Sequence, residues 1–430
     1  MWPNLANSST TSPGELISSS IPKHLSLTSR HTVSSQGTPP PSVPQLEGFF
    51  DDLYDLVRNI EFREVSNEFQ AELKSYIMKL RGTEEIIVES DKTRNLYKMD
   101  KDTYEKHLVE NVTKEYKYCP EDELNKVNKK TCEIATNLGI GDRMEIFPRK
   151  QCKITLKDHK PTFPGKLSWR LLNPAKSELA KVSKQILEPI ISGIKAIKGL
   201  NLWGDTATAI KWFNTFKAED SQDLYFLQFD ITSYYPSISK DLLKKALKWA
   251  QQHYDIDQED IDIILASRES FLFNKDKLHT KQGSTPNSHF DVPMGAWDSA
   301  EVCEIVGLYL LAKIKTVFGD NMFFGLYRDD GLALVKGSGP QLDRKRKQLT
   351  KIFKEAGLGI EALTNIRTAN FLDVTFDLDT MSHRPYKKPN SDTKYIHVKS
   401  DHPPSITKAV PKTVEKRLSM FSSNKEIFDQ

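Results

Sequence analysis

The sequence predicts an α+β protein with an antiparallel sheet, preceded by a disordered tail. Two patterns predict the sheet: residues 224–230 form a short apolar run that ends in a carboxylate, and residues 322–335 form two apolar runs around a tight Asp-Asp-Gly. The first pattern is typical of a buried strand. The second is typical of a β-hairpin in which Gly331 supplies the unusual backbone angles. Apolar residues at helical spacing over residues 46–80 predict the helical part.

The first 44 residues differ in composition from the rest of the chain. Ser, Thr and Pro occupy 23 of these 44 positions, and Glu15 is the only acidic residue. Such a segment buries too little apolar surface to offset its conformational entropy, so residues 1–45 are expected to be disordered. A Ser-rich, acid-poor leader also fits a transit peptide, although Lys23 and Arg30 are its only Lys and Arg residues.

The local patterns that follow the tail predict individual elements. Helices are expected over residues 46–60, 69–80, 102–118 and 240–252, with a short hairpin over residues 85–99. Residues 154–156 and the segment around Phe371 have the pattern of strands. The apolar positions after Gly295 predict a core helix.

Charge and cysteine usage exclude several classes of protein. The net charge of +3 is too balanced to indicate a nucleic-acid-binding protein by itself. Two regions are nevertheless basic: residues 139–200 contain 13 Lys or Arg and 5 Asp or Glu, and residues 384–430 contain 10 and 5. Each could be a solvated face, but two such regions around an acidic site would suit a phosphate backbone. The sequence has no C-x-x-C, so no zinc ribbon is expected, and no long apolar run, so no membrane span is expected. It also has no apolar leader, which favours an intracellular protein in the nucleus or cytoplasm.

The carboxylates at the ends of the predicted strands carry the chemistry. If the strand that ends at Asp230 lies beside the hairpin, Asp230 meets Asp329 and Asp330. Clustered carboxylates repel unless a hard cation lies among them, and oxygen ligands suit Mg²⁺ or Mn²⁺. Two such ions about 3.5–4 Å apart are the common arrangement for phosphoryl transfer. The alternative is that Asp329-Asp330-Gly331 is only a turn.

These motifs resemble those of reverse transcriptases, in the same order along the chain. Asp230 followed after four residues by Tyr235 resembles motif A, and Tyr327-x-Asp329-Asp330 resembles motif C. Weaker matches are Trp169-Arg170-x-Leu172 with the fingers strand, Pro293-Met294-Gly295 with motif B, and residues 370–376 with the start of motifs D and E. Residues 386–403 are similar to the start of the thumb in Penelope-like reverse transcriptases, and Asp91-Lys92 with Tyr104 to their N-terminal extension. The resemblance covers residues 85–425.

The resemblance implies a right-hand polymerase fold with fingers, palm and thumb. It divides the chain into a tail (1–45), a helical N-terminal extension (46–138), fingers (139–222), a palm (223–380) and a partial thumb (381–430). Met294 stands where motif B usually has Gln, and Arg328 fills a position where smaller or apolar residues are common. With Gln430 the last residue, only a short thumb and no appended nuclease are expected.

The resemblance also implies a role for each site residue. Asp230 and Asp329 are the expected ligands of two Mg²⁺ or Mn²⁺ ions, with the Ile231 carbonyl as a third group and Asp330 in support. Tyr235 would exclude the 2′-hydroxyl of a ribonucleotide, whereas Tyr234 would belong to the core. The other expected nucleotide-binding residues are Lys157, Lys160, Arg170, Gly295 and Arg367, and the nucleic-acid-binding residues are Lys166, Tyr327, Arg328, Lys387 and Lys388.

The implied activity is RNA-dependent DNA synthesis, in which dNTPs are added to a primer 3′-hydroxyl. The partners are then an RNA or DNA primer–template and dNTPs, with no membrane and no obligatory protein partner. A DNA-templated polymerase is an alternative, because Asp230-x-x-Ser233-x-Tyr235-Pro236 also resembles motif A of family B DNA polymerases. A non-catalytic, domesticated polymerase fold that only binds nucleic acid is a second alternative, and a metal-dependent nuclease is a third.

Overall fold

A computed structural model describes residues 44–60, 68–93, 95–139, 150–174, 178–217, 223–282, 289–319, 322–387, 395–396, 400 and 402–429. The chain forms two compact units. The smaller unit contains residues up to Thr83 together with residues 128–146, and the larger contains Glu84–Val127 and Phe147–Gln430. The tail predicted over residues 1–45 lies outside the described residues, except for the first residues of helix α2.

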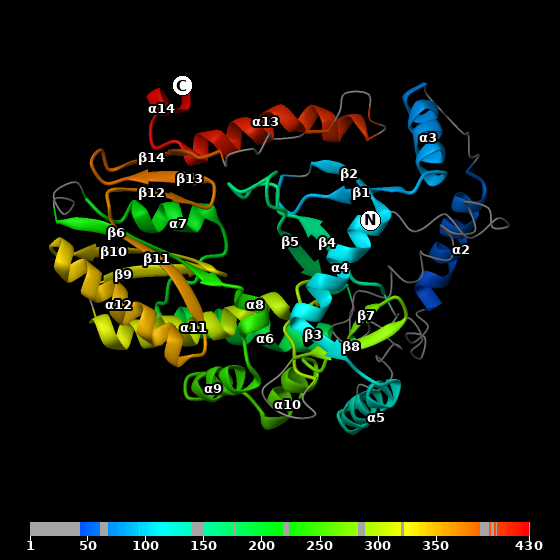
Figure 1. The fold of residues 1–430 in the computed structure, drawn as a ribbon, viewed down its shortest axis with the longest axis horizontal. Coiled ribbons are helices and arrows are strands. Elements are labelled where there is room, and N and C mark those ends of the chain that lie inside the picture. Colours follow the sequence, from blue (N-terminus) through cyan, green and yellow to red (C-terminus); the bar gives the residue numbers. More distant parts are fainter. Residues whose placement is uncertain are drawn as a thin grey trace. The chain divides into compact units, whose positions relative to one another are not determined.

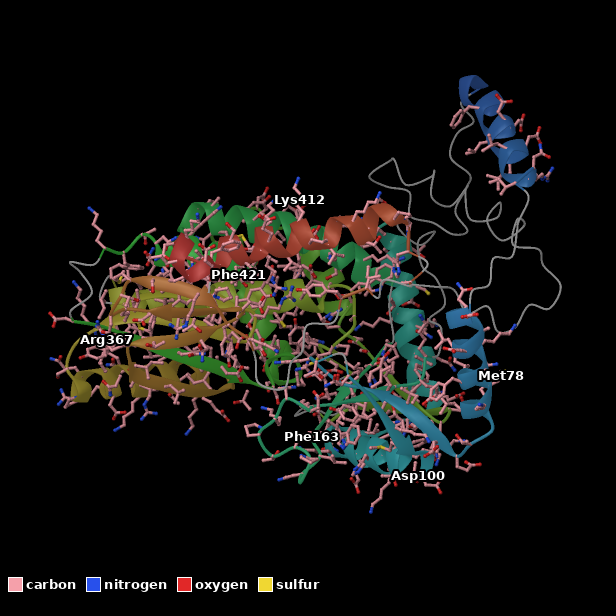
Figure 2. The ribbon with its side chains drawn as sticks, turned by 90° about the horizontal axis from the view of Figure 1, so that it is seen from above. Met78, Asp100, Phe163, Arg367, Lys412 and Phe421 are labelled. Atoms are coloured by element: carbon pink, nitrogen blue, oxygen red, sulfur yellow. The ribbon has the colours of Figure 1, made fainter. Side chains whose placement is uncertain are left out.

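The smaller unit is helical. Helices α2 (Pro44–Arg58) and α3 (Glu68–Arg81) confirm the two helices expected over residues 46–80, and the C-terminal part of α5 (Glu121–Asn137) belongs to the same unit. Several large apolar side chains of these helices are exposed, and Figure 2 labels one of them, Met78.

The larger unit is built around a four-stranded antiparallel sheet, which we call the central sheet (Figure 1). Its strand order is β11 (Gly359–Ile366), β6 (Leu224–Thr232), β10 (Asp330–Lys336) and β9 (Met322–Tyr327). The strand expected at residues 224–230 and the hairpin at residues 322–335 are both confirmed, and they are direct neighbours because β6 pairs with β10.

Alternate side chains of β6 enter two different cores, as strand geometry requires. Leu227, Phe229 and Ile231 pack into the larger core, whereas Leu224 and Phe226 on the opposite face pack into the smaller one. The helices of the larger core are α6 (Glu178–Lys198), α8 (Tyr234–Ser237), α9 (Lys240–Gln251), α10 (Gln258–Ala266), α11 (Ser299–Phe318) and α12 (Gly339–Glu355). The apolar positions after Gly295 are buried along α11, which confirms the expected core helix.

The smaller core is closed by α7 (Thr206–Phe213) and a second sheet. This sheet has the order β12 (Thr368–Phe371), β13 (Val374–Asp377) and β14 (Ser382–Pro385), so the strand expected near Phe371 is confirmed. Helix α13 (Pro404–Phe421) is anchored there by Phe421, which Figure 2 labels. The carbonyl oxygen of Phe421 lies 3.0 Å from Nδ1 of His383. The short helix α14 (Lys425–Asp429) follows.

Three small β elements of the larger unit supply the remaining strands. They are the hairpin β1 (Glu85–Glu89) with β2 (Leu96–Asp100), the hairpin β4 (Lys153–Leu156) with β5 (Trp169–Leu172), and the sheet of β3 (Tyr116–Tyr118), β8 (Lys277–Lys281) and β7 (Leu272–Asn274). The hairpin expected over residues 85–99 and the strand over residues 154–156 are therefore confirmed.

The helix expected over residues 102–118 is shorter than predicted. Helix α4 (Lys101–Glu115) ends before Tyr116, which has an extended backbone and pairs with Lys281. The Tyr116 hydroxyl donates a hydrogen bond of 2.6 Å to the buried carboxylate of Asp291. This tertiary contact favours the strand, and nothing in the local pattern of residues 102–118 indicates it.

Candidate active site

Asp230 lies where one face of the central sheet is no longer covered. It is on the same face of β6 as Leu224 and Phe226, but the smaller core that buries those two residues does not extend to it. Asp329 lies in the two-residue turn between β9 and β10, and its carbonyl oxygen accepts a hydrogen bond of 2.8 Å from the Ile231 N–H. The end of β6 and the hairpin turn are therefore held together by their backbones.

The Asp230 carboxylate experiences the charge of two other acids. Burial raises its pKa above the ordinary aspartate value, and Asp329 and then Glu361 raise it further, while Lys92 and Lys160 act in the opposite direction. Glu361 is the β11 residue paired with Asp230. Because the acids repel one another, a cation that binds among them relieves an unfavourable interaction.

Two cavities of about 340 and 910 Å³ meet at these carboxylates. Asp230 and Asp329 line both cavities, as do Lys92, Arg170 and Tyr235. Lys157 and Lys160 line only the smaller cavity, whereas Gly295 and Asp330 line only the larger one. Both cavities lie within the larger unit.

The backbone of the hairpin turn differs from the sequence-based expectation in one respect. Gly331 was expected to supply the unusual backbone angles, but the residue with a left-handed backbone is Arg328, with φ of 53°. Gly331 is instead required for packing, because a Cβ atom there would lie 2.1 Å from the Phe229 ring. The left-handed backbone at Arg328 sets the direction in which its side chain leaves the turn, and this side chain contacts Tyr235.

The two tyrosines after β6 have different environments. Ser233, with φ of 48°, turns the chain so that Tyr234 enters the core, where its hydroxyl donates to the Cys303 carbonyl at 2.7 Å. This confirms the expectation that Tyr234 is a packing residue. Tyr235 lines both cavities, and its hydroxyl accepts a hydrogen bond of 2.9 Å from Nη1 of Arg328.

Arg328, which was expected to contact nucleic acid, therefore contacts Tyr235, the candidate sugar-sensing residue. Its Nη2 atom also lies 3.8 Å from Oε1 of Glu304 on α11. Burial raises the pKa of Tyr235 to about 12, so the hydroxyl stays protonated at neutral pH. Arg328 also lines the larger cavity together with Tyr327, the other residue of the hairpin expected to contact nucleic acid.

The donor set at the carboxylates fits a hard divalent cation. Asp230 and Asp329 offer carboxylate oxygens, and Ile231 lines the smaller cavity beside them. Within the described part of the chain, no group of three or more His, Cys, Asp or Glu side chains is arranged to hold a metal ion. Two carboxylates with positions left for water and phosphate oxygens are what Mg²⁺ uses at many phosphoryl-transfer sites, whereas structural zinc requires a fuller protein ligand set.

Of the four cations predicted at the site between residues 157 and 170, three line a cavity and one does not. Lys157, Lys160 and Arg170 line the smaller cavity, and burial, followed by the charge of Arg170, lowers the pKa of Lys157. Arg170 already forms an ion pair, with 2.9 Å between its Nη1 and Oδ1 of Asp91. Lys166 is exposed in the loop between β4 and β5 and lines neither cavity.

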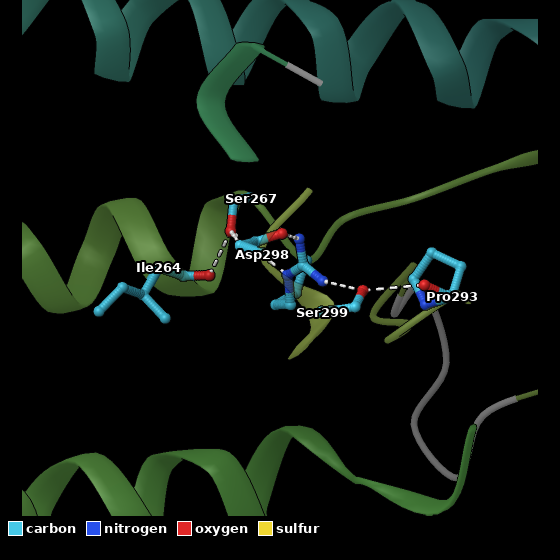
Figure 3. Close-up of polar contacts among 6 residues, drawn as sticks. Ile264, Ser267, Pro293, Asp298 and Ser299 are labelled. Atoms are coloured by element: carbon cyan, nitrogen blue, oxygen red, sulfur yellow. Dashed lines mark hydrogen bonds and ion pairs between the residues drawn. The ribbon is translucent and has the colours of Figure 1, made fainter. Parts of the chain in front are cut away.

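Gly295 is confined by both its backbone and its surroundings. Its φ is 116°, and a Cβ atom there would lie 2.9 Å from the Asn173 carbonyl oxygen. The segment that carries it is supported by a buried ion pair between Arg268 and Asp298 (Figure 3). Ser299 connects that pair to the segment, because its Oγ accepts from Arg268 at 3.1 Å and donates to the Pro293 carbonyl at 2.8 Å.

Two further predicted residues are not brought to the carboxylates. Arg367 donates hydrogen bonds to the Asp379 carboxylate and to the Leu224 carbonyl. Leu224 begins β6, roughly 20 Å along the strand from Asp230. Figure 2 labels Arg367 near the edge of the unit. Lys387 is exposed after β14 and lines neither cavity. Lys388 lies outside the described residues.

The structure adds residues to which the sequence assigned no role at the site. Lys92 lines both cavities although it comes from the hairpin β1–β2, far upstream of the motifs. Glu361 lines the smaller cavity from the exposed face of β11, and nothing in the local sequence indicates that it pairs with Asp230. The Arg268–Asp298 pair was missed because its two members lie on different elements, 30 residues apart.

Comparison with known proteins identifies the fold. No family model and no curated protein matches the sequence. Among solved structures, a telomerase from Candida albicans in complex with the TWJ fragment of telomeric RNA has a TM-score of 0.56 and 12% identity, over 94% of this chain and 75% of that one. An apo telomerase from Candida tropicalis has a TM-score of 0.50 and 11% identity, over 80% of this chain and 67% of that one.

The chain has a reverse-transcriptase-like polymerase fold. This confirms the fold class expected from motifs A and C, while identities of 11–12% carry no information about template or partner. None of the helices in the described ranges is long and apolar enough to cross a membrane.

Proposed function

We propose that this protein is a template-directed, RNA-dependent DNA polymerase that adds dNTPs to a primer 3′-hydroxyl with the help of two divalent ions. The observation that carries the proposal is the position of Asp230 and Asp329. Asp230 lies on β6 and Asp329 lies in the turn that leads into the adjacent strand β10, and both line the two cavities where these meet.

The two cavities suit the two substrates of such a reaction. The smaller one is lined by Lys157, Lys160 and Arg170, whose positive charges suit a triphosphate. The larger one is lined by Gly295, Arg328 and the motif C residues, and also by Leu372 and Asp373. We assign the smaller cavity to the incoming nucleotide and the larger one to the primer–template end.

In this proposal, the residues of the site have distinct roles. Asp230 and Asp329, with the Ile231 carbonyl, would hold Mg²⁺ or Mn²⁺, and Asp330 would support the turn. When bound, such ions activate a 3′-hydroxyl and neutralise charge on the transferred phosphate. The basic side chains orient the polyphosphate for in-line attack, and Tyr235 limits the space beside the ribose.

Primer extension on matched RNA and DNA templates tests the proposal. We expect incorporation of dNTPs on the RNA template in the presence of Mg²⁺ or Mn²⁺. Incorporation on DNA templates alone would support a DNA-templated polymerase instead. Tight binding of primer–template without incorporation under any of these conditions would support the non-catalytic alternative, and cleavage of the template would support a nuclease.

A further inference from the structure

We propose that Lys92, carried by the loop between β1 and β2, is a nucleotide-binding residue that contacts the polyphosphate of the incoming nucleoside triphosphate. This inference rests on the proposed polymerase function and extends it to a part of the chain upstream of motifs A, B and C. It means that the β1–β2 hairpin completes the nucleotide site.

The loop that carries Lys92 is fixed on one side of this residue by Asp91. The Asp91 N–H donates to the Leu156 carbonyl at 2.8 Å, and the Asp91 carboxylate pairs with Arg170. Ser90 forms an isolated parallel bridge with Leu156. These contacts attach the end of β1 to the β4–β5 hairpin.

The loop is fixed on its other side by a single buried carboxylate. Asp158 accepts hydrogen bonds from the Thr93 hydroxyl, from Nδ2 of Asn95 at 2.9 Å and from the Tyr97 hydroxyl at 2.8 Å. Burial would raise the pKa of Asp158, but these hydrogen bonds outweigh burial and lower it, so the carboxylate is ionised at neutral pH. Lys92 is thus held between two anchored residues.

The position of Lys92 distinguishes it from the other cations. It lines both cavities, beside Asp230 and Asp329, and it is exposed. It forms no hydrogen bond or ion pair with another residue of the described ranges, whereas the charge of Arg170 is already balanced by Asp91. A mobile ammonium group on a fixed backbone, next to a metal-binding pair of acids, suits a phosphate oxygen.

The test measures dNTP binding separately from catalysis. A primer terminated with a dideoxynucleotide is annealed to an RNA template, and the Kd for the next dNTP is measured in Mg²⁺ for the wild type, Lys92→Ala and Lys92→Arg. We expect Lys92→Ala to weaken dNTP binding by about 10- to 100-fold, the effect of losing one charge-assisted hydrogen bond. Lys92→Arg should keep most of the affinity, and the Kd for primer–template should change less than about twofold.

Lys98→Ala is the matched control. Lys98 belongs to the same hairpin and is also exposed, but it pairs with Glu85 and lines neither cavity. Unchanged dNTP affinity in Lys92→Ala, or a loss of primer–template affinity instead, would overturn the inference. Both results leave the polymerase proposal intact as long as the wild type extends primers, whereas a wild type without incorporation removes the polymerase proposal itself.

Discussion

Replacement of Tyr235 tests how this site chooses between deoxyribonucleotides and ribonucleotides. The hydroxyl end of the ring is held by the 2.9 Å hydrogen bond from Arg328. A ribonucleotide whose 2′-hydroxyl overlaps a ring fixed in this way must shift. A shift of about 1 Å costs on the order of 100-fold in rate.

We therefore expect Tyr235→Ala to lower the preference for dNTP over rNTP by about 100-fold, while dNTP use changes much less. Arg328→Ala keeps the ring but frees it, so it should lower the preference by a smaller factor, about 10-fold. The measured quantity is the ratio of kcat/KM for dNTP to kcat/KM for rNTP in single-nucleotide primer extension.

Tyr234→Ala is the internal control for this prediction. Tyr234 is 2% exposed and packs in the larger core, so its loss should destabilise the protein by about 3–5 kcal/mol without changing the sugar preference. If Tyr234→Ala lost the preference and Tyr235→Ala kept it, the assignment of the two side chains would be reversed. If neither variant changed the ratio, steric selection at this position would be refuted.

Three further predictions follow from the same geometry. Asp298→Ala leaves the charge of Arg268, which is 1% exposed, buried without its partner. The free energy of unfolding measured by denaturant titration should therefore fall by about 3–5 kcal/mol. The double variant Arg268→Met with Asp298→Leu should recover much of that loss. Gly295→Ala, at a φ of 116° and 2.9 Å from the Asn173 carbonyl oxygen, should lower the Tm and raise the KM for dNTP, and wild-type values for both would contradict the packing seen there. Affinity for primer–template should fall more than about tenfold between 50 and 200 mM salt if phosphate contacts dominate, and a flat salt dependence would exclude that.

The sequence predicted those features that depend on local pattern. The apolar run before Asp230 and the paired runs around Asp329 each have the period of a strand, so both elements were recognisable without knowledge of the fold. That the two elements are neighbours was an assumption, and the pairing of β6 with β10 confirms it.

The features that the sequence did not predict depend on contacts between distant segments. Lys92 reaches the carboxylates only because Asp91 and Asn95 attach its loop to the β4–β5 hairpin, about 60 residues later in the chain. Tyr116 leaves its helix because of Asp291, which lies 175 residues away. Arg367 comes just before the strand recognised around Phe371, but its position depends on the pairing of β11 with β6, which places it at the far end of β6.

The most direct test of the polymerase proposal compares wild type with Asp329→Asn in primer extension on an RNA template, with and without divalent ions. We predict that the wild type incorporates dNTPs in Mg²⁺ or Mn²⁺ and stops when a chelator is added. Asp329→Asn should lose at least about 100-fold of this rate while it still binds primer–template, because the ions supply several kcal/mol of transition-state stabilisation. Equal incorporation by both proteins, or incorporation that persists in the chelator, would contradict the assignment of Asp230 and Asp329 as the metal-binding pair.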